Sequence, residues 1–310
     1  MDYKPITLAD IYEARQRIAP LIRRTYLINA PQLTKISGSN ISLKLENLQV
    51  TGSFKPRGVA NKLLSMGEEE RRRGVVAVTT GNHGRAIAYI AQELSVPATI
   101  CISENVPDYK RAAIRRYGAR LVVGGKTYDQ AVQTMKEISS KEGLTLIGSF
   151  EEPKITAGHG TIGIELLEDY PQVDTVLIPL AAGGLLIGIA TALRASNPEV
   201  KMIGVAMDRG ALLVNSLIAG KVVEFVEEPT LADALMGGLG PDAEAVFKIV
   251  QPYVDEAVTV SETEISSAMA YGMDQHHQII EGAGAVGLAA LMYSKVKQLG
   301  EHTAVIVTGG

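Results

Sequence analysis

The sequence has 310 residues, a formal net charge of −4 and 46% hydrophobic residues, a composition typical of a globular protein. The mild acidity argues against nucleic-acid binding, because a polyphosphate partner would need a basic face. A single cysteine, Cys101, excludes an internal disulfide and favours a small buried side chain. Because no apolar run is long enough to span a membrane and the N-terminus lacks a signal-peptide core, we expect a cytoplasmic protein that binds no membrane.

The first predicted element is an N-terminal helix that Thr7 caps. From Gly74 onward, short apolar runs alternate with amphipathic helices. Strands are expected at 75–80, 96–103, 119–125 and 144–149, and helices at 84–94, 107–117 and 127–141. This alternation predicts a parallel sheet, because parallel strands need a crossover connection that a helix can supply.

The same alternation returns in the C-terminal half of the chain. Strands are expected at 174–180, 201–208, 254–260 and 303–310, and Ser261 with Glu264 predicts a capping box for the helix after the third of them. We therefore predict an α/β fold with two domains. A small mobile domain, 72–146, is inserted into a larger one made of 1–66 and 150–310.

The first loop that could bind a ligand is TTGNHG, residues 79–84, which follows a predicted strand and opens a helix. Two threonine hydroxyls, the Asn82 amide and the helix N-terminus would converge there. Such a cluster suits a carboxylate or a phosphate. An ordinary strand-to-helix turn with capping side chains would have the same sequence, so both interpretations stay open.

Two further glycine-containing loops also follow predicted strands. In LAAGGLL, 180–186, Gly183 and Gly184 would let the backbone approach a phosphate at the next helix N-terminus, or they would only allow tight packing. In VTGG, 307–310, the Thr308 hydroxyl can donate or accept a hydrogen bond.

Two other patterns are weaker indications of a site. GAGAVG, 282–287, has dinucleotide-binding spacing, but QHHQIIE before it predicts a helix, whereas that site needs a strand. The small residues are better explained by close helix packing. His276, His277 and Glu281 could suggest a metal site, but adjacent histidines point to different faces of a helix and do not form a standard ligand pair. We predict no metal site.

Lys55 lies in an unusual setting, TGSFKPRG at 51–58. Lysine is normally a surface residue with a solvated head. Here it follows a Gly-Ser turn and is flanked by Phe54 and Pro56, which stiffen the chain. The lysine either ends an exposed loop or is held where its amine does chemistry.

These segments together resemble a known family. SFKPRG and TTGNHG, followed by AGHGTIGIE (157–165), AAGGL (181–185), EGAGAVGLAAL (281–291) and TGG (308–310), resemble the fold-type II pyridoxal-phosphate enzymes, above all the threonine and serine dehydratases and serine racemases. The resemblance spans nearly the whole chain. It implies two open, twisted, mostly parallel sheets flanked by helices, as in tryptophan synthase β, with pyridoxal 5'-phosphate between the domains. It also implies a small amino-acid substrate and a homodimer.

The resemblance also implies roles for individual residues. Lys55 would form the Schiff base with the cofactor and act as nucleophile and base, as a lysine with a lowered pKa can. Asn82 would bond the ring hydroxyl, and Thr308 the pyridine nitrogen. The other cofactor contacts would be Phe54, Ala181, Ala182, Gly183, Gly184 and Leu185. The substrate carboxylate would be held by Thr79, Thr80, Gly81, Asn82 and His83.

The chain departs from the family pattern at several positions. Ala181 and Ala182 replace glycines of the phosphate loop, and alanine disfavours positive φ. The VAMD stretch lacks the acidic residue of metal-binding members, which agrees with no metal site. Thr80 occupies the position of the racemase serine. The terminal SGGN motif stops after its second glycine, which leaves open whether the natural chain continues.

Arg85 is the last departure, since relatives usually have glutamine there. Its guanidinium would bind a second anionic or polar group of the substrate, or it would only face solvent. The variant GNHGRA is similar to a dehydratase of hydroxyectoine breakdown.

The function that the resemblance implies is a pyridoxal-phosphate-dependent ammonia-lyase. It would eliminate water from a β-hydroxy amino acid and release a 2-oxo acid and ammonia. A racemase and a β-replacement synthase on the same fold remain alternatives, as does a non-catalytic ligand-binding homologue. The sequence does not choose among threonine, serine, 3-hydroxyaspartate, a phenylserine and a hydroxyectoine-derived acid.

Overall fold

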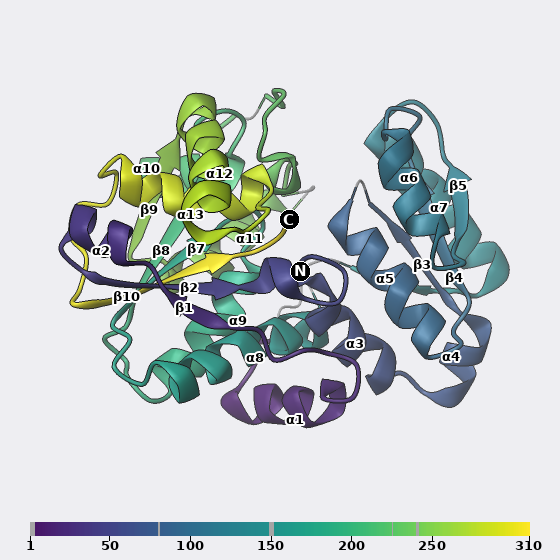
Figure 1. Ribbon diagram of the computed structural model, residues 1–310. Coiled ribbons are helices and arrows are strands. Elements are labelled where there is room, and N and C mark those ends of the chain that lie inside the picture. Colours follow the sequence, from purple (N-terminus) through teal and green to yellow (C-terminus); the bar gives the residue numbers. More distant parts are fainter. Residues whose placement is uncertain (1–3, 80, 149–151, 225, 240–241) are drawn as a thin grey trace.

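The computed structural model of the protein has two lobes, and each is built on its own β-sheet (Figure 1). It describes residues 4–79, 81–148, 152–224, 226–239 and 242–310. The large lobe combines the N-terminal elements with the C-terminal half of the chain, and the small lobe, drawn in blue and teal, is formed by the segment between them. Among the described helices, none is both long and apolar enough to cross a membrane.

The large lobe contains a six-stranded, mostly parallel sheet. Its strands, in spatial order, are β1 (Leu27–Asn29), β2 (Asn40–Leu45), β10 (His302–Val307), β7 (Thr175–Pro179), β8 (Lys201–Met207) and β9 (Glu256–Val260). At one edge β1 pairs antiparallel with β2, and the other neighbours are parallel. The inner strands are buried apolar runs, because helices cover both faces of the sheet.

The helices of the large lobe include two that approach each other very closely, α8 and α9. The set is α1 (Leu8–Ile18), α2 (Pro31–Ser37), α3 (Lys55–Ser65), α8 (Pro153–Asp169), α9 (Gly184–Arg194), α10 (Leu212–Ala219), α11 (Ala243–Val250), α12 (Glu262–His276) and α13 (Gly282–Met292), with the short 3₁₀ turns η1 (Glu46–Leu48), η2 (Asp233–Leu235) and η3 (Gln251–Tyr253). A Cβ atom on Gly188 of α9 would lie 2.6 Å from the carbonyl oxygen of Thr156 and 2.7 Å from the amide nitrogen of Gly160, both in α8. Glycine is therefore needed where these two helices cross.

The small lobe contains a four-stranded parallel sheet. Its strands, in spatial order, are β5 (Arg120–Val123), β4 (Ala98–Ile102), β3 (Val75–Val78) and β6 (Thr145–Leu146). Its helices are α4 (Glu68–Arg73), α5 (Asn82–Glu93), α6 (Asp108–Arg115) and α7 (Tyr128–Glu142). A second buried core, separate from that of the large sheet, fills this lobe and includes Ile87, Ile100 and Ile114. Side chains of α3 from the large lobe also pack into it.

The α/β fold with two mostly parallel sheets is confirmed, and so are two helix starts. The Thr7 hydroxyl accepts a hydrogen bond from the Asp10 amide at 3.2 Å, and the Ser261 hydroxyl accepts one from the Glu264 amide at 3.4 Å. All four strands of the second sheet lie within 72–146, the segment that we predicted as an insertion.

Three local expectations differ from the structure. Strands β1 and β2 were not expected, because β1 has only three residues and β2, with the sequence NISLKL, alternates polar and apolar residues and is not a continuous apolar run. The terminal strand ends at Val307, and the residues after it leave the sheet to contact the loop before α3. The segment before GAGAVG is not helical up to the glycines, because His277 adopts a left-handed conformation with φ of 52° and ends α12. GAGAVG itself lies in α13, and no strand directly precedes it.

Candidate active site

The candidate site lies at the carboxyl-terminal edge of the large sheet. Strands β2, β10 and β7 are parallel neighbours, so the segments that follow them meet at one edge. These segments are the loop before α3, the terminal residues from Thr308 onward and the loop 180–183. In open α/β sheets this edge is where ligands bind. Three of the sequence-predicted segments are thus brought together by strand order alone.

The loop that holds Lys55 is tied to the end of the chain by backbone hydrogen bonds. The Phe54 amide donates to the Thr308 carbonyl at 3.1 Å, and the Gly310 amide donates to the Gly52 carbonyl at 2.9 Å. Gly52 has a φ of +78°, and a Cβ atom there would lie 3.0 Å from the Gly310 carbonyl oxygen. Both facts require glycine in this turn. Helix α3 then begins at Lys55, so the lysine side chain projects from a helix start that is fixed from two sides.

The amine of Lys55 makes no hydrogen bond or ion pair with any described residue. It lies 4.8 Å from the centre of the Phe54 ring, a distance at which the ring face attracts a cation. Burial lowers the pKa of Lys55 from 10.5 to about 8, and the negative charge of Glu281 opposes this shift only in part. A lysine in this setting has a neutral, nucleophilic amine at pH values well below those of a surface lysine.

The glycine loop after β7 leads directly into α9. Gly183 has a φ of +96°, and a Cβ atom there would lie 2.4 Å from a methyl carbon of Val250, so only glycine fits. Ala181 and Ala182 are half-buried, and neither adopts a positive φ. The two alanines are therefore compatible with the loop, which leaves its backbone amides at the N-terminus of α9, where an anion is favoured.

The loop of the small lobe is organised by Thr79. Its hydroxyl accepts hydrogen bonds from the Gly81 amide at 3.2 Å and from the Gly84 amide at 3.3 Å, so it caps the start of α5. His83 in the same loop is buried, and burial together with the charge of Lys55 lowers the pKa of His83 to about 3. Its imidazole is therefore neutral. Thr80, a predicted catalytic and substrate-binding residue, lies outside the described residues.

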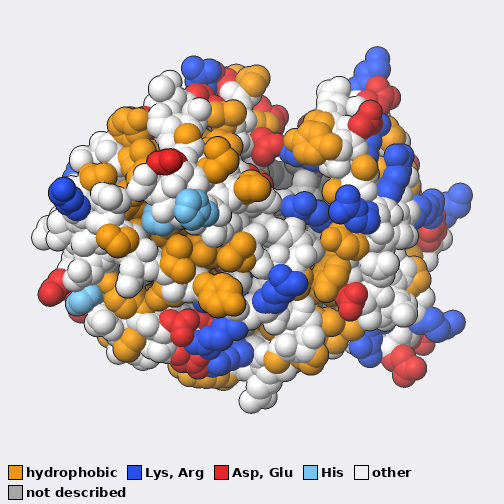
Figure 2. Space-filling view, viewed as in Figure 1, with side chains coloured by type: hydrophobic (Ala, Val, Ile, Leu, Met, Phe, Trp, Pro, Cys, Tyr) orange, Lys and Arg blue, Asp and Glu red, His pale blue; other side chains and the backbone are white. Residues whose placement is uncertain are grey.

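Two contacts join the small lobe to the large lobe beside this loop. The Asn82 amide donates to Glu281 Oε1 at 2.8 Å, and Lys110 of α6 forms an ion pair with Asp233 of η2. Burial and the charge of Asp233 raise the pKa of Glu281 above its usual range. Figure 2 shows a notch between the two lobes on one face of the molecule. Asn82 of α5 thus lies where the two lobes meet.

Sequence reasoning missed several residues of this region. Glu281 was considered only as a metal ligand, and Lys110 and Asp233 were not considered. Their partners are 199 and 123 residues away in sequence, and no local pattern marks either pair. The acidic Glu281 beside the glycines of α13 was the one available signal, because a charged residue before a buried helix needs a partner.

The residues present fit pyridoxal phosphate. Beside the unpaired Lys55 amine, the hydroxyls of Ser53 and Thr51 are buried and have no hydrogen-bond partner among the described residues. The structure also offers two donors that pyridoxal phosphate needs. They are the backbone amides at the start of α9 and the second N–H of Asn82. An amine that forms a Schiff base, a phosphate cradle and a donor to the ring oxygen are all available.

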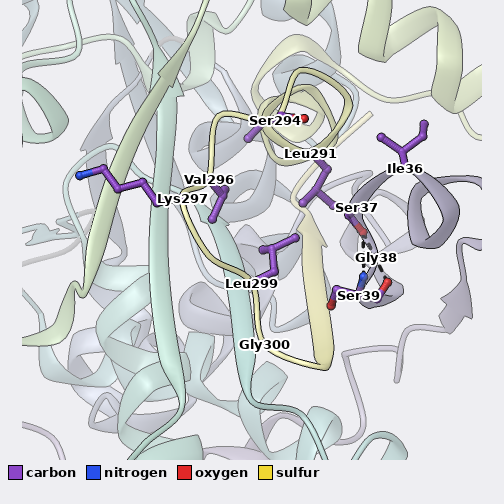
Figure 3. A pocket seen from close by; sticks show the side chains of 11 residues that line it. Ile36, Ser37, Gly38, Ser39, Leu291, Ser294, Val296, Lys297, Leu299 and Gly300 are labelled. Carbon is purple, nitrogen blue, oxygen red and sulfur yellow. Dashed lines mark hydrogen bonds between the residues drawn. The ribbon is translucent and has the colours of Figure 1, made fainter.

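A separate hollow of about 190 Å³ lies on the opposite edge of the large sheet (Figure 3). It is lined by the end of α2 at Ser37–Ser39 and by the segment 294–300, which precede β2 and β10 respectively. Figure 3 shows Lys297 extending away from the hollow. None of the predicted site residues lines it, so it is not part of the candidate site.

Comparison with known proteins agrees with this geometry. The family model described as "Pyridoxal-phosphate dependent enzyme" matches residues 18–309. The chain is 42% identical to a putative threonine dehydratase of Sinorhizobium fredii, over 98% of this chain and 92% of the relative. It is 40% identical to the L-threonine ammonia-lyase of Thermotoga maritima, over 98% of this chain and 75% of the relative. The solved structure of maize serine racemase superposes with a TM-score of 0.92 at 29% identity, over 99% of this chain and 94% of that chain.

Proposed function

Because the chain belongs to the family of pyridoxal-phosphate dependent enzymes, we propose that it removes water from a β-hydroxy amino acid to give a 2-oxo acid and ammonia. Relatives named threonine dehydratase or threonine ammonia-lyase match almost the whole chain. The observation that carries the proposal is the buried Lys55 amine, which has a pKa of about 8 and no hydrogen-bond partner among the described residues, at the sheet edge where α9 also begins.

The chemistry divides between the cofactor and the protein. Pyridoxal phosphate, when bound, supplies an electron sink for the electron pair left at the α-carbon of the substrate. Lys55 accepts the α-proton, because its lowered pKa keeps part of the amine neutral near neutral pH. The β-hydroxyl leaves as water after it gains a proton, and hydrolysis of the dehydrated product gives the 2-oxo acid and ammonia.

Orientation of the reactants is the task of the surrounding groups. The backbone amides of Asn82 and His83, at the start of α5, would hold the substrate carboxylate. The amides of Thr79 and Gly81 already donate to the Cys101 carbonyl and to the Thr79 hydroxyl. With the cofactor bound, Thr308 would bond the pyridine nitrogen through a neutral hydroxyl, and Asn82 would bond the ring hydroxyl. A hydroxyl does not hold that nitrogen protonated as a carboxylate would, which weakens the sink and favours prompt elimination. We propose that the small domain, 72–146, is mobile and closes over the substrate, and that the lobe contacts at Asn82 and Lys110 hold its closed position.

Threonine is the substrate that the relatives' names support best, and the name of maize serine racemase adds serine. The stretch GNHGRA supports a hydroxyectoine-derived acid as the narrower alternative. A screen of β-hydroxy amino acids for 2-oxo acid and ammonia, with added pyridoxal phosphate, separates the two. Release of neither product from any of them would contradict the proposed reaction.

Racemisation is a second candidate activity, favoured by the close superposition on maize serine racemase. A racemase returns a proton to the opposite face of the α-carbon, which needs a second acid. Thr80 is the residue that we propose for that role. Exchange of the α-hydrogen with deuterium from solvent, together with formation of the D-enantiomer and without 2-oxo acid, would favour this activity.

We also propose that the protein is a cytoplasmic homodimer. Support for the dimer comes from large apolar side chains of the large lobe that are mostly exposed, including Tyr26 at 71%, Met273 at 62% and Ile279 at 79%. Light scattering of the purified protein tests the dimer. Support for the cytoplasm comes from the single thiol, Cys101, which is buried and whose pKa is raised to about 11 by burial. Cell fractionation tests the compartment.

A further inference from the structure

The amide of Asn82 is held from two sides by charged residues. Its Nδ2 donates to Glu281 Oε1 at 2.8 Å, and its Oδ1 accepts from Arg85 Nη2 at 3.4 Å. Arg85 is on the same helix, three residues further on, whereas Glu281 belongs to the large lobe. The amide therefore connects a cation of one lobe with an anion of the other.

The hydrogen-bonding capacities of the three groups permit one orientation of this amide. A guanidinium only donates, so the amide oxygen must face Arg85, and this turns the NH₂ group toward Glu281 Oε1, which accepts from it. A flipped amide would place NH₂ against guanidinium and oxygen against carboxylate. It would lose both hydrogen bonds and add two repulsive contacts.

The orientation matters because the NH₂ group has two hydrogens. Glu281 accepts one of them, and the other remains for an oxygen acceptor on the cofactor side. If the amide were flipped, its oxygen would face that acceptor oxygen, and no hydrogen would be available for a bond between them. The hydrogen bond to the cofactor ring oxygen, which the proposed function requires of Asn82, thus depends on the groups behind the amide.

Arg85 is held in place for this role. Its Nη2 would lie 3.3 Å from a Cβ atom on Gly52, so the guanidinium packs against the glycine turn that precedes Lys55. The side chain is half-buried, and in the described part of the chain no carboxylate lies within ion-pair distance of it. Its charge acts on Glu281 through space and favours the ionised carboxylate. Lys110 and Lys55 act on Glu281 in the same direction as Arg85, whereas burial and the charge of Asp233 raise the pKa of Glu281 above its usual range.

We propose that Arg85 is a positioning residue, which together with Glu281 fixes the Asn82 amide with a hydrogen directed to the ring oxygen of pyridoxal phosphate. The inference rests on the proposed function and deepens it. It assigns Arg85 to the cofactor side of the site, through Asn82, and not to direct contact with the substrate.

The test uses the full chain with Arg85→Met, which removes the donor, and Arg85→Lys, which keeps a group that only donates. Arg115→Met is the matched control, because Arg115 is an exposed arginine on α6 of the same lobe. Each apoprotein is titrated with pyridoxal phosphate, and the absorbance of the bound cofactor is recorded from pH 6 to 10. We expect Arg85→Met to weaken cofactor binding by about fivefold, the effect of losing one hydrogen bond. We also expect the pH midpoint of its absorbance change to move, and Arg85→Lys and Arg115→Met to behave like wild type.

Three outcomes would overturn the inference. In the first, Arg85→Met binds the cofactor like wild type with the same pH midpoint. In the second, its only effect is a lower melting temperature of the apoprotein, as expected for a purely structural contact. In the third, it raises KM for the amino acid while the cofactor affinity is unchanged, which would place Arg85 against the substrate. If Arg85→Met does not fold, Arg85→Gln replaces it. Because a glutamine supports either orientation of the Asn82 amide, we expect cofactor binding to be weakened to a smaller degree. Wild-type cofactor affinity of this variant would again contradict the inference. These outcomes leave the proposed function intact, whereas a wild-type protein that binds no pyridoxal phosphate would remove both.

Discussion

Replacing Arg57 with methionine tests the buried charges that support the start of α3. Arg57 lies two residues after Lys55 and is 1% exposed. Its guanidinium donates twice to Glu46, both at 2.8 Å, and twice to Glu165, at 2.7 and 3.0 Å. Glu46 belongs to η1 and Glu165 to α8, so Arg57 ties the helix that begins at the proposed catalytic lysine to two other elements.

The magnitude follows from the charge balance of this cluster. Its four ionisable side chains have no net charge: Lys44, Glu46, Arg57 and Glu165. Removing Arg57 leaves one buried negative charge without compensation, and breaking such a pair costs about 3–5 kcal/mol. Glu165 keeps Lys44 at 2.6 Å, whereas Glu46 keeps only the Thr25 hydroxyl. Because one of the two carboxylates remains paired, we expect a loss of about 3 kcal/mol, at the lower end of that range.

The assay is urea unfolding of the apoprotein, followed by far-ultraviolet circular dichroism. Arg120→Met is the control, because Arg120 forms an exposed pair with Glu142 that should contribute less than about 1 kcal/mol. Adding Glu46→Gln to Arg57→Met should recover part of the loss, since it removes the unpaired charge. The reasoning is refuted if Arg57→Met costs no more than the control.

The remaining predictions concern the glycine loop and two titrating groups. Gly183→Ala should lower the free energy of unfolding by about 1–3 kcal/mol, because an L-residue is strained at positive φ, and it should weaken cofactor binding; melting curves with and without pyridoxal phosphate check both. The rate of cofactor uptake should rise about tenfold per pH unit below pH 8 and level off above it, because only the neutral Lys55 amine reacts; stopped-flow absorbance from pH 6.5 to 9.5 measures this, and a flat profile would contradict the lowered pKa. Burial lowers the pKa of His159 well below 6.5, so its contribution to stability is present above pH 6.5 and is lost as the pH falls further. His159→Gln should therefore make acid destabilisation shallower by up to about 1.4 kcal/mol per pH unit below pH 6.5, measured by urea midpoints at each pH.

The alternation of strands and helices could be predicted because helices cover both faces of each sheet, which leaves strands as plain apolar runs. The runs 174–180 and 201–208, for example, correspond to β7 and β8 almost to the residue. Strand β2 was not predicted because its sequence, NISLKL, alternates polar and apolar residues, with Lys44 at its fifth position. The structure buries that lysine completely by pairing it with Glu165, which lies far along the chain.

In the candidate site, too, residues in local motifs could be predicted, whereas contacts between distant parts of the chain could not. Residues in local glycine motifs, such as Lys55 and Gly183, could be proposed from sequence because a turn or a helix start near an anion needs a characteristic local pattern. The partner of Asn82 could not, because Glu281 reaches it across the lobes. For the Thr79 hydroxyl the sequence left two interpretations open, a ligand contact and a helix cap. In the structure it accepts from two backbone amides of its own loop, which is the capping arrangement.

One measurement tests the central claim most directly. Purified protein with added pyridoxal phosphate is incubated with threonine and with serine, and the 2-oxo acid and ammonia are quantified for wild type and for Lys55→Ala. We predict equal amounts of the two products from wild type, together with a visible absorbance band of bound cofactor, and loss of both the band and the turnover in Lys55→Ala. Undiminished turnover by Lys55→Ala, or a wild type that yields only the opposite enantiomer of the substrate, would contradict the account.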